Sequence, residues 1–285
     1  MDLPSPQLPN ASAPLVAGLQ RPMLELQEVT KVYPSGKIVL TKLSLAICNG
    51  EVIVILGTSG CGKTTLLRML AGLDKPTEGR VTTSVLRPDG KKPVVSYMPQ
   101  GDSLFPWRTV HQNVTLPSEV LQEHGCLCPS DLMKSMDISD FQDKFPFELS
   151  GGMRRGVELA RALLPDFNIL LLDEPLVHLD VTWHDKLVKT IRQRVKQRLT
   201  DASSGPVCAV IVTHNLEEAG ELADRILVLS RDTNCRGKEA GASVLIDEPV
   251  PRTVTDGVTA EFVTPEKQQI ILEHLRRLPC DSQRD

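Results

Sequence analysis

The sequence lacks a long run of apolar residues. Its apolar runs, such as "VIVIL" from Val52 and "ILLL" from Ile169, are far shorter than the roughly 20 residues that a transmembrane helix needs. The first 22 residues contain proline, serine and alanine, but no basic segment followed by a long apolar block. We therefore expect a flexible N-terminal tail over residues 1–22 in place of a signal peptide, and a chain that does not itself cross a membrane.

The sequence also lacks an excess of basic residues. Its 32 lysine and arginine residues stand against 36 aspartate and glutamate residues, which gives a net charge of −4. Because proteins that bind nucleic acid usually carry a basic surface, we expect no nucleic-acid partner.

No cysteine spacing typical of a zinc site is present. Among the seven cysteines, only Cys126 and Cys128 lie close together, and they do not form the CxxC pair typical of a zinc site. Reduced thiols are usual in cytosolic proteins, so the cysteine pattern favours the cytosol.

What the sequence does contain is an alternation of apolar strands with helical patterns. Residues 24–29 and 43–47 alternate apolar and polar side chains, which predicts half-buried strands at a sheet edge. Residues 51–56 are almost continuously apolar, as in a buried parallel strand. Further strands are predicted at residues 93–99, 168–175, 206–214 and 224–230, and helices at 150–164, 181–199 and 216–223. Such alternation indicates an α/β domain.

Two segments depart from this alternation. Residues 101–148 are polar and interrupted by proline, and with the helix that follows they predict an inserted helical subdomain at about residues 101–164. After residue 230 the pattern fades until Thr264, which can cap a final helix that begins at Pro265. We therefore expect a main domain over residues 23–240 and a C-terminal extension over residues 241–285.

The segment "GTSGCGKT", residues 57–64, has the P-loop spacing G-x-x-x-x-G-K-[ST] between a buried strand and an amphipathic helix. Glycines let backbone N–H groups converge on phosphate oxygens, Lys63 can reach the β- and γ-phosphates, and Thr64 offers a hydroxyl to Mg²⁺. The alternative is a chance glycine turn, but the strand, loop and helix context favours nucleotide binding. The predicted binding residues are Gly57, Thr58, Ser59, Gly60, Cys61, Gly62, Lys63, Thr64 and Thr65.

A second motif, "ILLLDEP", ends a buried strand in two adjacent carboxylates, Asp173 and Glu174. Two solvated loop acids are the ordinary interpretation of such a pair. Beside a P-loop, however, carboxylates at a strand end are typical of a catalytic site, because buried charges are costly unless a cation or a reaction uses them. We expect Asp173 to hold the Mg²⁺ shell and Glu174 to orient or deprotonate the attacking water.

The stretch "LSGG", residues 149–152, stands directly before a predicted helix and ahead of the two carboxylates. In this order the motifs resemble the ATP-binding subunits of ATP-binding-cassette (ABC) transporters. The resemblance implies a P-loop ATPase fold with a RecA-like parallel sheet core, an antiparallel β edge and an inserted helical subdomain. It also implies that two cassettes pair head to tail. Ser150, as an N-cap, and the bare N–H groups of Gly151 and Gly152 then face the nucleotide of the other cassette.

Four further residues take roles from the resemblance. Tyr33 stands where the family places an aromatic ring that stacks on adenine, and Gln100 matches the glutamine that contacts Mg²⁺ and the attacking water. His214 matches the histidine that contacts the γ-phosphate, and Asp180 ends the loop that crosses the dimer interface. For Tyr33 and His214, a purely structural role is the alternative.

The chain departs from the family pattern near the LSGG stretch. The family commonly continues it as "LSGGMRQRVALARAL", whereas this chain has Arg155, Gly156 and Glu158 in place of Gln, Arg and a small residue. The interfacial loop has Val177 and His178 where "SA" is usual. We expect these changes to weaken the dimer contact, and Gly156→Arg to raise dimerisation or turnover.

The resemblance extends to one group of importers. Residues 103–117, "SLFPWRTVHQNVTLP", and residues 250–262 resemble segments of importers for nitrate, sulfonate, taurine or bicarbonate. We expect an ATP- and Mg²⁺-dependent ATPase at the cytoplasmic face of the inner membrane, with a second cassette, permease subunits and a periplasmic or lipoprotein substrate-binding protein as partners. A regulatory or weakly hydrolysing subunit that pairs with a more active cassette is the alternative.

Overall fold

The structure is a computed structural model that describes residues 22–122, 127–177, 179–201, 205–233 and 239–249. The predicted tail over residues 1–22 lies outside these ranges except for Pro22. The predicted helix that begins at Pro265 also lies outside them. In the described part of the chain, no helix has the length and apolar character needed to cross a membrane.

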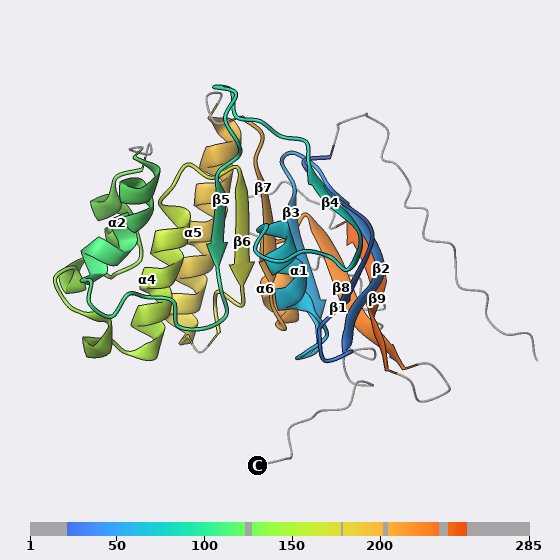
Figure 1. The fold of residues 1–285 in the computed structure, drawn as a ribbon. Coiled ribbons are helices and arrows are strands. Elements are labelled where there is room, and N and C mark those ends of the chain that lie inside the picture. Colours follow the sequence, from blue (N-terminus) through green and yellow to red (C-terminus); the bar gives the residue numbers. More distant parts are fainter. Residues whose placement is uncertain (1–21, 123–126, 178, 202–204, 234–238, 250–285) are drawn as a thin grey trace, which may run out of the picture.

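One mixed sheet organises the described residues, with nine strands in the order β4-β1-β2-β9-β8-β3-β7-β6-β5 (Figure 1). Its parallel part comprises β8 (Arg225–Thr233), β3 (Val52–Gly57), β7 (Cys208–Val212), β6 (Ile169–Asp173) and β5 (Val95–Met98). In its other part, β1 (Leu24–Val32) pairs antiparallel with β2 (Ile38–Ile47) and with β4 (Glu78–Thr83). The predicted parallel core with an antiparallel edge is confirmed.

Two hydrophobic cores cover the two faces of the parallel strands. Every residue of β3, β6 and β7 is buried, as their continuous apolar sequences predict. Because side chains alternate along a strand, Val54 of β3 joins a core with α4 (Gly151–Leu163) and α5 (Val181–Thr200), whereas Ile55 joins the core beneath α1 (Lys63–Leu70). The buried strands are therefore rigid supports for the loops at their ends.

The segment between β5 and β6 is helical, as predicted. It contains α2 (Val110–Leu121), α3 (Pro129–Ser135), two short 3₁₀ turns (Ser139–Phe141 and Pro146–Glu148) and α4. Its described residues include no strand. In Figure 1 these helices lie beyond the β5 edge of the sheet, at the side remote from the antiparallel strands. Helices α5 and α6 (Leu216–Leu222) also agree closely with their predicted ranges.

Two strands were not predicted from the sequence. Strand β4 is largely exposed, so it has no apolar alternation to reveal it. Strand β9 (Glu239–Pro249) pairs antiparallel with β8 and meets β2 in parallel at Leu40 and Ala242. The sheet thus continues past residue 240, where we expected the main domain to end.

Gly156 has a packing role that the sequence interpretation missed. A Cβ atom at this position would lie 3.1 Å from Cζ3 and 3.3 Å from Cη2 of Trp183, which belongs to α5. The glycine therefore allows the Trp183 ring to lie directly against α4. The structure thus gives a packing reason for the glycine, and the expected gain in dimerisation or turnover from an arginine at this position stays a prediction.

We expect Gly156→Arg to destabilise the nucleotide-free protein by about 1–3 kcal/mol, since the added side chain overpacks the α4–α5 contact. The midpoint and slope of urea unfolding measure this effect. Gly151→Ala is the matched control, because nothing lies within 4 Å of a Cβ atom at residue 151. Equal or greater stability of the Gly156→Arg variant would contradict the packing role.

Candidate functional site

The P-loop joins β3 to α1 and depends on glycine for its shape. A Cβ atom on Gly57 would lie 2.7 Å from the carbonyl oxygen of Leu229, and one on Gly62 would lie 2.9 Å from Cγ1 of Val39. Gly62 also caps α1 with a φ of 108°, in the left-handed region. The predicted strand, loop and helix arrangement is confirmed, and larger residues do not fit at these two positions.

Lys63 is the first residue of α1 and lies inside the P-loop. Its side chain is 6% exposed, and its Nζ donates hydrogen bonds to the carbonyl oxygens of Gly57 (2.7 Å) and Thr58 (2.9 Å). The ammonium group is thus held within the curve of the loop, at the N-terminus of a helix. Both the charge and the helix terminus favour a bound anion.

Asp173 ends β6 as a buried carboxylate that is 1% exposed. Within the described residues, neither of its carboxylate oxygens makes a hydrogen bond that meets ordinary geometric criteria. Burial raises the pKa of Asp173 above its ordinary value, and the carboxylate of Glu174 adds to this; Thr64, Lys63 and Arg155 oppose it in part. A buried carboxylate whose oxygens lack well-formed hydrogen bonds, beside a threonine hydroxyl, suits a hard cation such as Mg²⁺.

Glu174 lies at the meeting point of three loops. Its backbone has a φ of 50°, and its N–H donates to the carbonyl oxygen of Val212 over 2.9 Å. Its Oε2 accepts a hydrogen bond from Nε2 of Gln100 over 3.0 Å, and its Oε1 lies 3.6 Å from Nδ1 of His214. The structure therefore brings together three residues that the sequence places far apart.

A cavity of about 370 Å³ lies over the P-loop, and Gln100 and Glu174 contribute to its wall. Tyr33 lines the same cavity and shares a hydrogen bond of 3.1 Å between its hydroxyl and that of Thr65. The Nζ of Lys31 lies 5.3 Å from the centre of the Tyr33 ring. The aromatic ring is thus fixed at the edge of the cavity, as a base-stacking residue requires.

Two site residues were missed by the sequence interpretation. Lys37 lines the cavity from the turn after Tyr33, and only its place in "YPSGK" could have drawn attention to it. Arg155 donates hydrogen bonds to the main-chain oxygens of Asp173 and Glu174. Because main-chain acceptors have no residue type of their own, no motif could have identified that contact.

The LSGG stretch and the interfacial loop lie apart from this cavity. Ser150 caps α4, with its Oγ accepting a hydrogen bond from the N–H of Met153 over 3.2 Å. Asp180 caps α5 in the same way through the N–H of Trp183 over 3.0 Å. Neither these caps nor the two signature glycines line the P-loop cavity. Their predicted contact with a second cassette stays a prediction.

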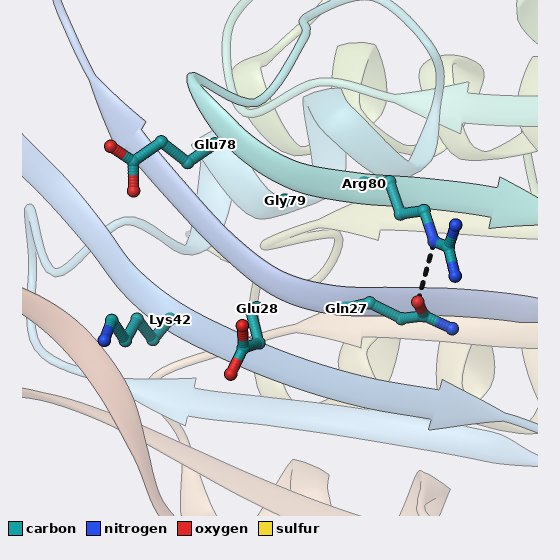
Figure 2. A pocket seen from close by; sticks show the side chains of 6 residues that line it. All are labelled: Gln27, Glu28, Lys42, Glu78, Gly79 and Arg80. Atoms are coloured by element: carbon teal, nitrogen blue, oxygen red, sulfur yellow. Dashed lines mark hydrogen bonds between the residues drawn. The ribbon is translucent and has the colours of Figure 1, made fainter.

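A second cavity of about 450 Å³ lies on the antiparallel strands, lined by Gln27, Glu28, Lys42, Glu78, Gly79 and Arg80 (Figure 2). Figure 2 shows its acidic and basic side chains spread over neighbouring strands, and the one interaction drawn among them joins Arg80 to Gln27 at 2.7 Å. Its charges do not converge on one point, so the P-loop cavity is the better candidate for a functional site.

Comparisons with known proteins agree with this geometry. The ABC transporter family model matches residues 40–177. The uncharacterized ABC transporter ATP-binding protein YtlC of Bacillus subtilis (strain 168) is 36% identical over 77% of this chain and 86% of that protein. The nitrate import ATP-binding protein NrtC of Synechocystis sp. (strain ATCC 27184 / PCC 6803 / Kazusa) is also 36% identical, over 81% of this chain but only 34% of its own length.

A solved structure is similar in fold as well as in sequence. It is the dimeric, post-hydrolysis structure of the ATP-binding cassette MJ0796 bound to ADP and Pi. The match has a TM-score of 0.65 and 28% identity, and it covers 81% of this chain and 100% of that one. The chain belongs to the ABC transporter ATP-binding proteins and is an ATPase with the P-loop fold of that family.

Proposed function

We propose that this chain is the ATP-hydrolysing subunit of an importer, with Glu174 as the general base. The observation that supports this role is the convergence of Gln100 and His214 on the Glu174 carboxylate at the edge of the P-loop cavity. A carboxylate held beside the phosphate site can take a proton from the attacking water. Gln100 orients that water, and His214 contacts the γ-phosphate.

The nucleotide binds with its phosphates on the P-loop and its base against Tyr33. Lys63 and the backbone N–H groups of the loop hold the phosphate oxygens, while Thr64, Asp173 and Gln100 hold Mg²⁺. When bound, Mg²⁺ neutralises negative charge on the β- and γ-phosphates. The buried carboxylate of Asp173, whose oxygens make no hydrogen bond of ordinary geometry with the described residues, supports this assignment of the metal site.

Hydrolysis in this proposal takes place between two cassettes. Ser150, Gly151, Gly152 and Asp180 of one chain face the nucleotide on the P-loop of the other. The open space around Gly151 supports this arrangement, because a phosphate can approach the N-terminus of α4 there. Closure of the two cassettes moves the membrane-spanning permease subunits, and hydrolysis opens the pair again.

The permease docks on the helical subdomain near Trp107, which is 70% exposed. The Trp107 ring lies edge-on to Phe105, with 5.4 Å between the ring centres. The loop that carries both rings is fixed from inside by buried Asn113, whose side chain bonds the main chain of Phe105 and the carbonyl oxygens of Arg108 and Thr109. An exposed aromatic pair on a rigid loop suits a protein–protein contact.

The imported substrate is a small anion of the nitrate, bicarbonate, sulfonate or taurine type, delivered by a periplasmic or lipoprotein binding protein. Residues 103–117 support this class, as do relatives named for nitrate and bicarbonate import at 36% and 37% identity. Relatives named for spermidine/putrescine and glycine betaine/carnitine/choline transport are 36% and 32% identical. Residues 250–262, the second segment that resembles the anion importers, lie outside the described residues.

The test is uptake by the complete assembly. The chain is purified with its membrane subunits and reconstituted into proteoliposomes, with this chain on the side that corresponds to the cytoplasm. Uptake of labelled nitrate, bicarbonate, taurine, putrescine and betaine is then compared, each in the presence of a matched binding protein. ATP-dependent uptake of an anion supports the proposal, whereas uptake of putrescine or betaine alone overturns the substrate class.

A regulatory subunit is the second candidate, favoured by the loss of the usual serine at Val177 in the interfacial loop. In that case the chain binds ATP but hydrolyses it slowly beside a more active cassette. Steady-state ATPase activity, measured for the chain alone and in the full assembly, separates the two functions. Near-zero activity in an assembly that contains only this cassette favours the regulatory role.

We expect Trp107→Ala to uncouple transport from hydrolysis. Because Trp107 is mostly exposed, the variant should keep the stability of the isolated chain to within about 0.5 kcal/mol. Uptake and stimulation of ATPase activity by the permease should fall about tenfold or more, as for a central aromatic in an interface. Leu86→Ala is the control, since Leu86 is 61% exposed outside the helical subdomain. Equal loss in both variants contradicts the docking site.

A further inference from the structure

We propose that Arg155 is a positioning residue for ATP hydrolysis, which ties the helix of the LSGG stretch to the general base and to Gln100. The inference rests on the proposed role of Glu174. Arg155 lies in the third position after that stretch and is not among the residues that line the P-loop cavity. It acts through the main chain of the residues that do.

The guanidinium of Arg155 is buried and reaches four acceptors. Its Nη2 donates to the carbonyl oxygens of Asp173 (2.6 Å) and Glu174 (2.7 Å). Its Nη1 donates to the carbonyl oxygen of Pro99 (3.1 Å) and to Oε2 of Glu158 (2.9 Å). Because a guanidinium is planar and has donors in fixed directions, these contacts fix two main-chain segments, Asp173–Glu174 and Pro99, relative to α4.

The first consequence concerns the shape of the loop at Glu174. The left-handed backbone of Glu174, with its φ of 50°, is unusual for a residue other than glycine. Two contacts hold it in place, because its N–H donates to Val212 and its carbonyl oxygen accepts from Arg155. The direction in which the Glu174 carboxylate points therefore depends on Arg155.

The second consequence concerns Gln100. Arg155 donates a hydrogen bond to the carbonyl oxygen of Pro99, the residue directly before Gln100. Glu158 binds Ser103 at the other end of this short loop. Oε1 of Glu158, a residue that is 2% exposed, accepts hydrogen bonds from the N–H (2.5 Å) and hydroxyl (2.9 Å) of Ser103. Arg161 donates to the Ser103 carbonyl oxygen over 2.8 Å. Helix α4 thus anchors the Gln100 loop at both ends.

One helix therefore sets the placement of both groups that handle the attacking water. Helix α4 starts at Gly151, in the stretch expected to meet the nucleotide of a second cassette. A shift of this helix on engagement is carried through Arg155 and Glu158 to Glu174 and Gln100. Loss of Arg155 should therefore slow the chemical step and leave nucleotide binding, which uses the P-loop, unchanged.

The experiment compares Arg155→Met with Arg194→Met in the complete ABC assembly. Arg194 is a close match, because it is 3% exposed and also donates to three main-chain oxygens and one carboxylate. Apart from Oε1 of Gln197 on its own helix, its acceptors belong to Leu163, Leu164, Pro165 and Asp166. These four residues precede β6 and so lie at the opposite end of that strand from Asp173. Both variants are assayed for kcat, KM, equilibrium ATP binding and thermal unfolding, below the unfolding transition.

For Arg155→Met we expect kcat to fall about 10- to 100-fold, as for a misplaced catalytic group, with KM and ATP affinity within about twofold of wild type. Arg194→Met should lower the unfolding temperature but keep kcat within about twofold. Wild-type kcat in Arg155→Met, or equal loss of kcat in both variants, overturns the proposal.

Two further variants keep the outcome decisive. If Arg155→Met does not fold, Arg155→Lys and Glu158→Ala replace it, because each removes only part of the hydrogen-bond network. In each of these variants kcat should fall about fivefold or more. Wild-type kcat in both variants refutes the proposal. Glu174→Gln is measured in parallel. If that variant keeps full turnover, the assignment of the base has failed. If it loses turnover while Arg155→Met does not, only the positioning role has failed.

Discussion

Glu174→Gln should lower the rate of ATP hydrolysis by about 10²- to 10⁴-fold, the contribution typical of a general base, while ATP binding stays intact. Glutamine keeps the size of the side chain but cannot accept a proton from water. Glu174 is only partly buried, and its backbone contacts to Val212 and Arg155 do not involve the carboxylate. We therefore expect a folded protein that binds ATP and accumulates as a closed dimer.

Single-turnover hydrolysis, nucleotide binding and size-exclusion chromatography with MgATP measure these three properties. Glu78→Gln is the control, because Glu78 lies in the second cavity on the antiparallel strands and should leave turnover unchanged. A Glu174→Gln protein that hydrolyses ATP at the wild-type rate would show that another group takes the proton.

Asp173→Asn should have two opposite effects, greater stability without nucleotide and almost no Mg²⁺-dependent hydrolysis. The raised pKa of Asp173, caused mainly by burial, means that folding favours the neutral side chain. Its carboxylate oxygens have no hydrogen bond within the described residues. Removing a buried charge that Thr64, Lys63 and Arg155 compensate only in part should therefore stabilise the metal-free protein by about 1–3 kcal/mol.

Urea unfolding with and without MgATP tests both effects. Wild-type protein should gain stability from Mg²⁺ with ATP, whereas the asparagine variant should gain much less, because the metal has lost its carboxylate ligand. Asp166→Asn is the contrasting control. Asp166 forms an ion pair with buried Arg194, so its loss should destabilise the fold. A metal-free Asp173→Asn protein less stable than wild type would mean that the carboxylate is satisfied in solution.

The features that the sequence predicted well have strong local causes. Continuous apolar runs predicted strands that are buried on both faces of the sheet, and β3, β6 and β7 are buried throughout. The helix start at Ser150 followed from a side chain that can bond the first free N–H groups. The P-loop could be predicted from its glycine spacing, because its shape requires glycine at particular positions.

The features that escaped prediction arise from contacts between distant segments. Strand β4 is too exposed for an apolar pattern, and β9 is defined by its pairing with β8 more than by its own sequence. The packing role of Gly156 depends on the Trp183 ring, which belongs to a different helix. Arg155 stood out in sequence only as a departure from the family pattern, since its acceptors are main-chain oxygens.

The ring of Trp183 against Gly156 also gives the protein an internal optical probe. The chain has two tryptophans, and the other, Trp107, is 70% exposed to water. Indole emission shifts to longer wavelength as the ring becomes hydrated, so Trp107→Phe would leave a single fluorophore between α4 and α5. Its emission maximum, followed in a stopped-flow instrument after mixing with MgATP, would then report whether and how fast the contact between α4 and α5 changes when nucleotide binds.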